Sequence, residues 1–196
     1  SSSISILRSL GTSVERIPEK TPGILNIEGV GMYGFSEPSD ILDAGNSGTT
    51  MRLMSGLLAA RSFNTVITGD ASLRTRPMSR ILEPLRQMGA SLSARNGNQF
   101  APLILDGGEL HGIDYRLPIA SAQVKSCILF AGLRANGETI VRSPSPCRDH
   151  SERMLSAMGA SIEYDAETAS ITASELKAID VDVPGDISSA AFWIVA

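Results

Sequence analysis

The chain has 196 residues, 42% of them hydrophobic and 19% charged, which is enough to bury one sizeable core or two small ones. Its 17 Lys and Arg residues and 21 Asp and Glu residues give a formal charge of −4 without a basic block, which argues against nucleic-acid binding. Its apolar runs are far shorter than the roughly 20 residues that a membrane-spanning helix needs, so no membrane partner is expected.

The chain begins and ends with predicted helices. Leu7 and Leu10 lie at helical spacing ahead of Gly11, which predicts a short amphipathic helix closed by a glycine. At the other end, Asp186 is a candidate N-cap for an apolar helix that stops after about three turns without a capping residue. We therefore expect the chain to be a piece of a longer protein.

Three segments of the chain share one pattern of a leucine, a glycine and an alternating run. They are LRSLGTSV at 7–14, LRQMGASL at 85–92 and LSAMGASI at 155–162. Each predicts an amphipathic helix, a glycine stop and then a strand. The glycines recur at intervals of roughly 70 to 80 residues, which is longer than an ordinary solenoid unit.

A second series of strongly apolar helices alternates with the first. These helices are predicted at 46–60, 120–135 and 186–196. Strand-like runs rich in β-branched residues lie between the two series, at 63–70, 100–107, 138–144, 161–174 and 179–185. The pattern predicts pseudo-symmetric α+β units packed around shared central helices, with chance similarity of three helix endings as the alternative.

Each apolar helix opens with small hydrogen-bonding residues, whose position at a helix N-terminus suits an anion. The candidates are Asn46, Gly48, Thr49 and Arg52 at the first opening, and Ser121, Gln123 and Lys125 at the second. Ordinary helix capping is the competing explanation, above all for Ser121.

Arginines lie in the segments that connect a predicted strand to the helix that follows it. Arg74 and Arg76 precede the helix of the second repeat, and Arg148 holds the equivalent place in the third. Guanidinium groups beside Ser and Thr residues suit phosphate or carboxylate recognition through paired hydrogen bonds. A surface ion pair of Arg148 with Asp149 or Glu152 is the alternative.

Other chemistry has little support in the sequence. His111 and His150 are far apart and stand in no metal-ligand spacing, so no metal site is expected. Cys127 falls in an apolar run and is expected in the core, while Cys147 is flanked only by Arg148 as a group that could activate a thiolate. Two cysteines are too few for a disulfide framework and have no CxxC partner for a metal site, so a reducing cytosol is the default expectation.

Several long motifs of the chain closely resemble the EPSP synthase family of enolpyruvyl transferases. They are LDAGNSGTTMRL, GDASLRTRPMSRILEPLRQMGA, ASAQVKSCILFAGL, CRDHSERML and VPGDISSAAF, in the family's order along nearly the whole chain. The resemblance implies an α/β (α+β) fold of two lobes, each an inside-out α/β barrel of three βαβαββ units around buried parallel helices. It implies that 1–183 are a partial N-terminal lobe, truncated at its start, and 184–196 the interlobe hinge and first turns of the other lobe.

The family activity implied by the resemblance is transfer of the enolpyruvyl group of phosphoenolpyruvate to the 5-hydroxyl of shikimate 3-phosphate, with release of phosphate. It needs no metal and no organic cofactor. The proton-transfer carboxylates belong to the other lobe, so the resemblance places no catalytic residue in this chain and implies no turnover by the chain alone. The parent is expected to be a monomer in the cytoplasm, or in the plastid if it comes from a plant.

The resemblance also assigns binding residues. Those implied for shikimate 3-phosphate are Ser121, Ala122, Gln123 and Arg148. Those implied for phosphoenolpyruvate are Asn46, Gly48, Thr49, Arg76 and Gln123, with Arg52 and Lys125 in support. Ala122 replaces a serine that some members carry, and a side chain at Gly48 would intrude on the phosphoenolpyruvate pocket.

Three other functions remain open from the sequence. The sister transferase that acts on UDP-N-acetylglucosamine is one, although the loop ASLRTRP lacks the cysteine usual there. A non-catalytic module that binds a phosphorylated ligand is the second. A purely structural repeat protein is the third, and it leaves the set of Asn46, Arg76 and Gln123 without an explanation.

Overall fold

The computed structural model describes residues 1–17, 23–186 and 190–191, which form two complete βαβαββ units and part of a third. The first unit consists of β3 (Leu42–Asp43), α2 (Gly48–Leu58), β4 (Thr65–Thr68), α3 (Ser79–Gln87), β5 (Leu92–Ala94) and β6 (Phe100–Leu105). The second consists of β7 (Asp114–Arg116), α5 (Ala122–Gly132), β8 (Thr139–Arg142), α6 (His150–Ala157), β9 (Ile162–Tyr164) and β10 (Thr168–Ile171). The partial unit contains α1 (Ser2–Ser9), β1 (Ser13–Ile17) and β2 (Ile24–Glu28).

Both complete units build the same four-stranded sheet. The strand orders are β3-β4-β6-β5 and β7-β8-β10-β9, and in each sheet the first two strands are parallel while the other pairs are antiparallel. The short 3-10 helix η1 (Leu73–Thr75) follows β4, and α4 (Arg95–Asn98) is a tight turn between β5 and β6. The repeat seen in the sequence is therefore a repeat of topology.

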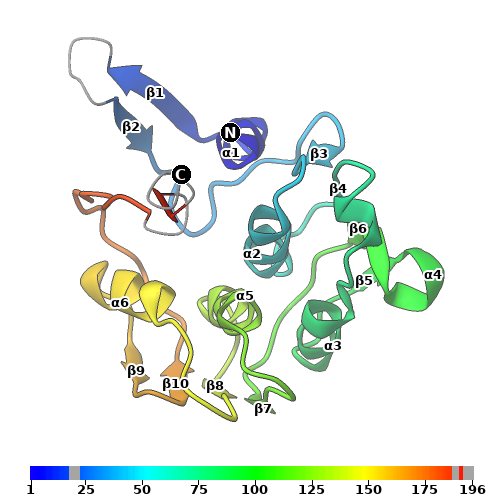
Figure 1. Cartoon of the computed structure of the whole chain (residues 1–196), viewed down its shortest axis with the longest axis vertical. Coiled ribbons are helices and arrows are strands. Elements are labelled where there is room, and N and C mark those ends of the chain that lie inside the picture. Colours follow the sequence, from blue (N-terminus) through cyan, green and yellow to red (C-terminus); the bar gives the residue numbers. More distant parts are fainter. Residues whose placement is uncertain (18–22, 187–189, 192–196) are drawn as a thin grey trace.

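The sheets and the β1-β2 hairpin lie outside, and helices α2 and α5 lie side by side between them (Figure 1). The two central helices approach closely because Gly56 has no side chain: a Cβ there would lie 2.2 Å from the carbonyl oxygen of Cys127. Both helices bury most of their residues in one continuous apolar core. This confirms the expected α/β architecture of units around buried parallel helices.

The three helix endings are also equivalent in detail. Gly11, Gly89 and Gly159 have φ angles of +93°, +99° and +86°, a conformation that favours glycine. After each glycine, the next amide donates to the carbonyl of the repeat's leucine, as from Ala90 to Leu85 at 2.9 Å. These bonds close the helix with a Schellman-type turn, so the shared sequence pattern encodes a shared helix stop.

The end of the described chain differs from the sequence prediction. Residues 179–185, expected to form a strand, have no regular secondary structure. No neighbouring strand pairs with them in the part of the chain that the structure describes, and Val181 and Val183 are exposed. The helix predicted from Asp186 onwards falls mainly outside the described residues. Among those that are described, no helix is long and apolar enough to cross a membrane.

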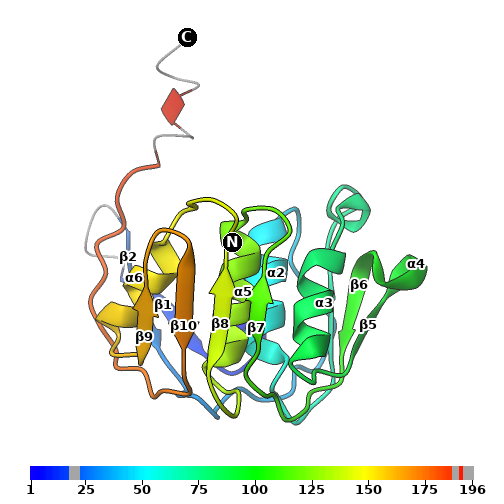
Figure 2. The same ribbon diagram turned by 90° about the horizontal axis from the view of Figure 1, so that it is seen from below.

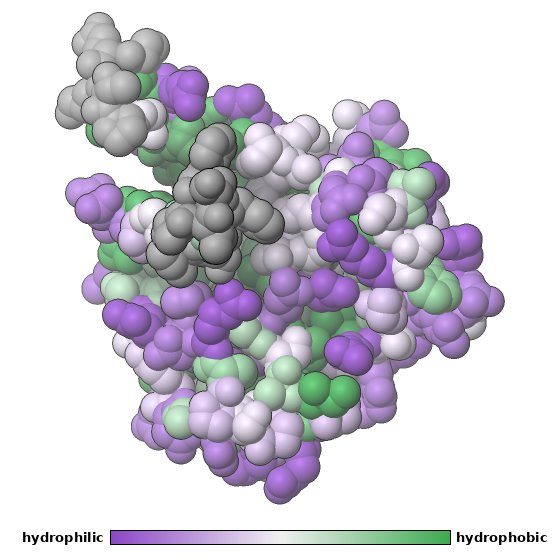
Figure 3. Space-filling view, in the orientation of Figure 1, coloured by the Kyte–Doolittle hydropathy of each residue, from purple (hydrophilic) through white to green (hydrophobic). Residues whose placement is uncertain are grey.

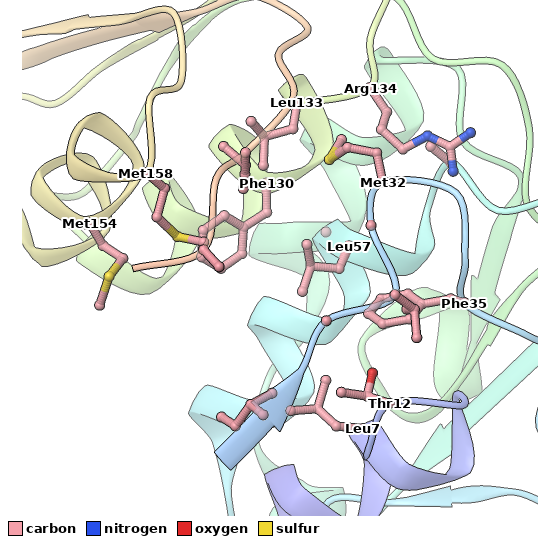
Figure 4. A pocket seen from close by; sticks show the side chains of 18 of the residues that line it. Leu7, Thr12, Met32, Phe35, Leu57, Phe130, Leu133, Arg134, Met154 and Met158 are labelled. Carbon is pink, nitrogen blue, oxygen red and sulfur yellow. The ribbon is translucent and has the colours of Figure 1, made fainter. Parts of the chain in front are cut away.

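An apolar cavity of about 560 Å³ lies beside the partial unit (Figure 4). It is lined by Leu7 of α1, Leu57 of α2, Phe130 of α5 and Met158, which follows α6, together with the loop around Met32. Within the described residues, β2 pairs only with β1, whereas the equivalent strands β6 and β10 each pair on both sides. Among the residues that the structure describes, one face of the central helices is therefore left open at this cavity.

Candidate functional site

The loops that carry the predicted site residues gather at one edge of the molecule. In each sheet the first two strands are parallel, so their carboxyl ends, and the helices that follow them, start at the same edge. Figure 2 shows the helices and strands lying roughly along one axis, with α2 and α5 next to each other, so the starts of these two helices come together. In the view of Figure 1, the surface over α2 and α5 is largely hydrophilic (Figure 3).

Both central helices have a serine at the N-cap. The Ser47 hydroxyl accepts from the amide of Thr50 at 3.1 Å, and the Ser121 hydroxyl accepts from the amide of Val124 at 3.4 Å. Each serine satisfies one of the amides that a helix leaves free in its first turn. Capping, which was the competing explanation for Ser121, is therefore present at both helices, and the positive ends of both helix dipoles lie at the edge described above.

Gln123 joins the two central helices at this edge. Its side-chain oxygen accepts from Arg52 Nη1 at 2.7 Å, and its side-chain nitrogen donates to the hydroxyl of Thr49 at 2.8 Å. Arg52 also donates through Nη2 to the carbonyl oxygen of Pro77 at 3.3 Å. The structure thus brings Gln123 together with two predicted residues, Thr49 and Arg52, that lie more than 70 positions earlier in the sequence.

A second set of hydrogen bonds holds Arg76. Its Nη2 donates to the side-chain oxygen of Asn46 at 2.7 Å, and the Asn46 side-chain nitrogen donates to Asp70 Oδ2 at 2.7 Å. Asp70 Oδ1 accepts from the amide of Leu73 at 2.7 Å, at the start of the turn that leads to Arg76. These bonds fix the guanidinium of Arg76 beside the opening of α2.

The two guanidinium groups flank Gly48. A Cβ built on Gly48 would lie 2.8 Å from Arg52 Nη1 and 3.5 Å from Arg76 Nη1. Burial, followed by repulsion from Arg76 and Arg80, lowers the pKa of Arg52. Within the described residues neither Arg52 nor Arg76 forms an ion pair with a carboxylate. The site therefore has concentrated positive charge that an anionic ligand would compensate.

Two predicted residues lie apart from these contacts. Lys125 is 1% exposed, and its ammonium forms an ion pair with Glu152 of α6 instead of facing solvent at the helix opening. Burial is the largest single influence and lowers the pKa of Lys125, but the hydrogen bonds and charges of Glu152 and Cys147 together outweigh it, so the net pKa is raised. Arg148 is exposed and, in the described structure, forms an ion pair with neither Asp149 nor Glu152.

The remaining polar candidates have no arrangement that suggests other chemistry. No group of three or more His, Cys, Asp or Glu residues in the described chain could hold a metal ion. Cys127 is fully buried, as expected, and burial raises the pKa of its thiol to about 12. Cys147 is half-buried, and both cysteines are free thiols.

Asp70 and Arg80 are charged residues of this region that the sequence did not single out. Asp70 reaches Asn46 across 24 positions, and Arg80 acts on Arg52 through its charge. Asp70 stands at the end of a predicted strand, six positions ahead of Arg76. This closeness to Arg76 was the only signal in the sequence that could have indicated a role for Asp70 in the site. The pairing of Asp70 with Asn46 depends on the parallel register of β3 and β4, which short-range patterns do not encode.

The family model described as EPSP synthase (3-phosphoshikimate 1-carboxyvinyltransferase) matches residues 1–196. The chain belongs to the EPSP synthase family. It is 52% identical to the 3-phosphoshikimate 1-carboxyvinyltransferase of Desulforamulus reducens over 98% of this chain, and 55% identical to that of Gloeothece citriformis over 96%. The solved EPSP synthase from Acinetobacter baumannii superposes with a TM-score of 0.91 at 47% identity, covering 99% of this chain.

The match covers only part of each relative. The chain spans 44% of the Desulforamulus protein, 42% of the Gloeothece protein and 44% of the solved Acinetobacter chain. The resemblance inferred from the sequence motifs is therefore confirmed at the level of the EPSP synthase family and its fold.

Proposed function

We propose that the protein carrying this chain transfers the enolpyruvyl group of phosphoenolpyruvate to the 5-hydroxyl of shikimate 3-phosphate and releases phosphate. Membership of the EPSP synthase family supports the reaction. The observation that carries the proposal is the pair of guanidinium groups of Arg52 and Arg76, which flank Gly48 without a carboxylate partner in the described residues. Both substrates are anions, and this is the place in the described structure best suited to receive one.

On this proposal, phosphoenolpyruvate lies against the opening of α2. Arg76 would bind its charged groups, held in place by Asn46, and the absence of a side chain at Gly48 leaves room between the two guanidinium groups. Thr49 and Arg52 would contribute through Gln123, to which both are hydrogen-bonded. Fixed donors of this kind stabilise negative charge as it moves during the reaction.

Shikimate 3-phosphate is assigned to the opening of α5. Ser121, Ala122 and Gln123 form the start of that helix, where the positive end of the dipole favours a phosphate. Ala122 lacks a hydroxyl, so the bond that a serine would form there is not available. Arg148 would join from the loop before α6, where its side chain is exposed. Lys125 would support the site indirectly, by fixing α5 to α6.

We further propose that 1–183 are a partial N-terminal lobe and that 184–196 are the hinge to a second lobe and its first helical turns. The supporting comparison is between units: α1, β1 and β2 match the last three elements of each complete unit. A β-α-β segment ahead of α1 would complete the third unit, with its helix in the apolar cavity and one strand on the open edge of β2.

The cavity gives this division a test. The fluorescent dye 8-anilinonaphthalene-1-sulfonate should bind the 196-residue chain, because its cavity exposes apolar side chains, and should not bind the full-length protein. Equal dye binding by both forms would contradict the proposed completion of the lobe.

We propose that the whole protein is a monomeric enzyme located in the cytoplasm, or in the plastid if its source is a plant. The free thiols of Cys127 and Cys147 support a reducing compartment. The chain alone is proposed to lack turnover, because the proton-transfer carboxylates would come from the second lobe. Light scattering after size-exclusion chromatography of the full-length protein tests the monomer, and a dimer mass would contradict it.

The activity itself is tested by phosphate release from the full-length protein. Release should require both phosphoenolpyruvate and shikimate 3-phosphate, and UDP-N-acetylglucosamine should not replace the acceptor. Release with the nucleotide sugar would favour the sister transferase. Binding of both ligands without release would favour a non-catalytic module, and turnover by the 196-residue chain alone would overturn the assignment of the missing groups.

A further inference from the structure

We propose that Asp70 is a positioning residue of the anion site: its carboxylate orients the side-chain amide of Asn46 so that the amide oxygen holds Arg76. This inference rests on the proposed function, because the anion that Arg76 would bind is taken to be phosphoenolpyruvate. Asp70 is not assigned a contact with either substrate; it acts through Asn46.

The contacts form a directed relay. Asp70 Oδ2 accepts from the Asn46 side-chain nitrogen at 2.7 Å, and the Asn46 side-chain oxygen accepts from Arg76 Nη2 at 2.7 Å. A carboxylate can only accept and a guanidinium can only donate. The Asn46 amide must therefore turn its nitrogen to Asp70 and its oxygen to Arg76, so the chemistry of its two neighbours fixes its orientation.

Asp70 also connects the two loops that carry these partners. Its other oxygen, Oδ1, accepts from the amide of Leu73 at 2.7 Å, at the start of the turn before Arg76. Its own amide donates to the carbonyl oxygen of Gly45 at 2.9 Å, in the loop that holds Asn46. One residue thus sets both the separation of the loops and the direction of the hydrogen bonds between them.

The close approach of these loops leaves little freedom for another arrangement. A Cβ on Gly69 would lie 2.4 Å from the carbonyl oxygen of Gly45, so the chain before Asp70 already touches the loop before α2. The backbone contact at Gly69 therefore fixes the distance between the two loops, and the Asp70 carboxylate fixes the orientation of the Asn46 amide. Loss of the carboxylate would free the Asn46 amide to turn without separating the loops.

The test uses Asp70→Asn in the full-length protein. The new side-chain oxygen would still accept from Leu73, but its nitrogen would face the Asn46 nitrogen, and two donors cannot bond. Asp165→Asn is the matched control, because the exposed Asp165 also caps a turn, accepting from the amides of Glu167 at 2.8 Å and Thr168 at 2.7 Å. Both variants remove one exposed turn carboxylate, and only one of them breaks the relay.

Asp70→Asn is expected to raise the KM for phosphoenolpyruvate about tenfold and to leave the KM for shikimate 3-phosphate within about twofold, as expected for loss of one charge-assisted bond. Its Tm should change no more than that of Asp165→Asn. Unchanged KM values, or an equal rise in both, would overturn the positioning role.

A second readout does not need turnover. The Nη–H signal of Arg76, assigned in 15N NMR spectra through its loss in Arg76→Lys, should be protected from solvent exchange in the parent sequence and in Asp165→Asn, because Nη2 donates to Asn46. It should lose that protection in Asp70→Asn. If the parent enzyme is active but Asp70→Asn keeps the protection of the Arg76 signal, the relay is refuted and the proposed function stands. If the Arg76 signal loses its protection in Asp70→Asn but the parent protein has no transferase activity, the proposed function is refuted and the relay stands.

Discussion

Arg52 and Gln123 are joined by a 2.7 Å hydrogen bond that links the N-terminal ends of the two central helices. Arg52 belongs to α2 of the first unit and Gln123 to α5 of the second, so this bond lies at the junction of two copies of the same βαβαββ topology. The pseudo-symmetry therefore has a chemical consequence. It brings two helix N-termini together and places one long polar side chain from each at the contact.

Gly48→Ala should weaken phosphoenolpyruvate binding, because the new Cβ would lie 2.8 Å from Arg52 Nη1 and 3.5 Å from Arg76 Nη1. The flexible guanidinium of Arg52 can move, so the fold should survive while the geometry of the site changes. We expect a rise of tenfold or more in the KM for phosphoenolpyruvate. Ser91→Ala is the control, since Ser91 is exposed and lies away from the helix openings, and an equal effect of both variants would refute the argument.

Lys125→Met should destabilise the fold by about 3–5 kcal/mol, because it leaves Glu152 buried and without its ionic partner. Replacing both residues, as Lys125→Met with Glu152→Leu, should recover most of that loss. Urea unfolding measures both values. A double variant as unstable as the single one would show that the ion pair itself, rather than the stranded carboxylate, determines stability.

Acidification should remove a contribution of Asp114 to stability. Hydrogen bonds from Arg142, of 2.9 Å to each carboxylate oxygen, lower the pKa of Asp114 below its unfolded value of roughly 3.9. A lowered folded-state pKa stabilises the fold above the unfolded value and loses that effect as the pH falls through the folded value. The difference in Tm between the parent and Asp114→Asn should thus be constant above about pH 5 and shrink below about pH 4. A constant difference down to pH 2 would contradict this.

The two thiols should differ in reactivity. Cys127 is fully buried with a pKa raised to about 12, whereas Cys147 is half-buried. A maleimide at pH 7.5 should label Cys147 in the native chain, and both cysteines after unfolding. Mass spectrometry of the digested protein locates the label, and native labelling of Cys127 would mean that the core opens far more readily than its packing indicates.

The sequence predicted the repeat because it is encoded locally. Gly11, Gly89 and Gly159 each end a helix through the same turn, and such a turn needs only a few neighbouring residues. The strand predicted at 179–185 failed because alternation alone does not supply a pairing partner.

The part of the site at the helix N-termini was predictable, because small polar residues ahead of an apolar run indicate where a helix begins. Ser47 and Ser121 are capping residues whose role follows from their neighbours. The role of Asp70 and the burial of Lys125 depend on which helices and loops become adjacent, and this is set by the packing of whole units. The bond between Arg52 and Gln123 depends on the same packing, and 71 positions separate its two residues.

The most direct test of the account is a calorimetric titration of phosphoenolpyruvate into the full-length protein saturated with 5-deoxyshikimate 3-phosphate, an acceptor analogue that lacks the reacting hydroxyl and therefore allows binding without turnover. Arg76→Ala should weaken binding at least tenfold. Arg74→Ala, which removes an exposed arginine two positions away, should bind as the parent does. If Arg76→Ala binds phosphoenolpyruvate as tightly as the parent, or if both variants weaken it equally, the cluster around Gly48 is not the anion site.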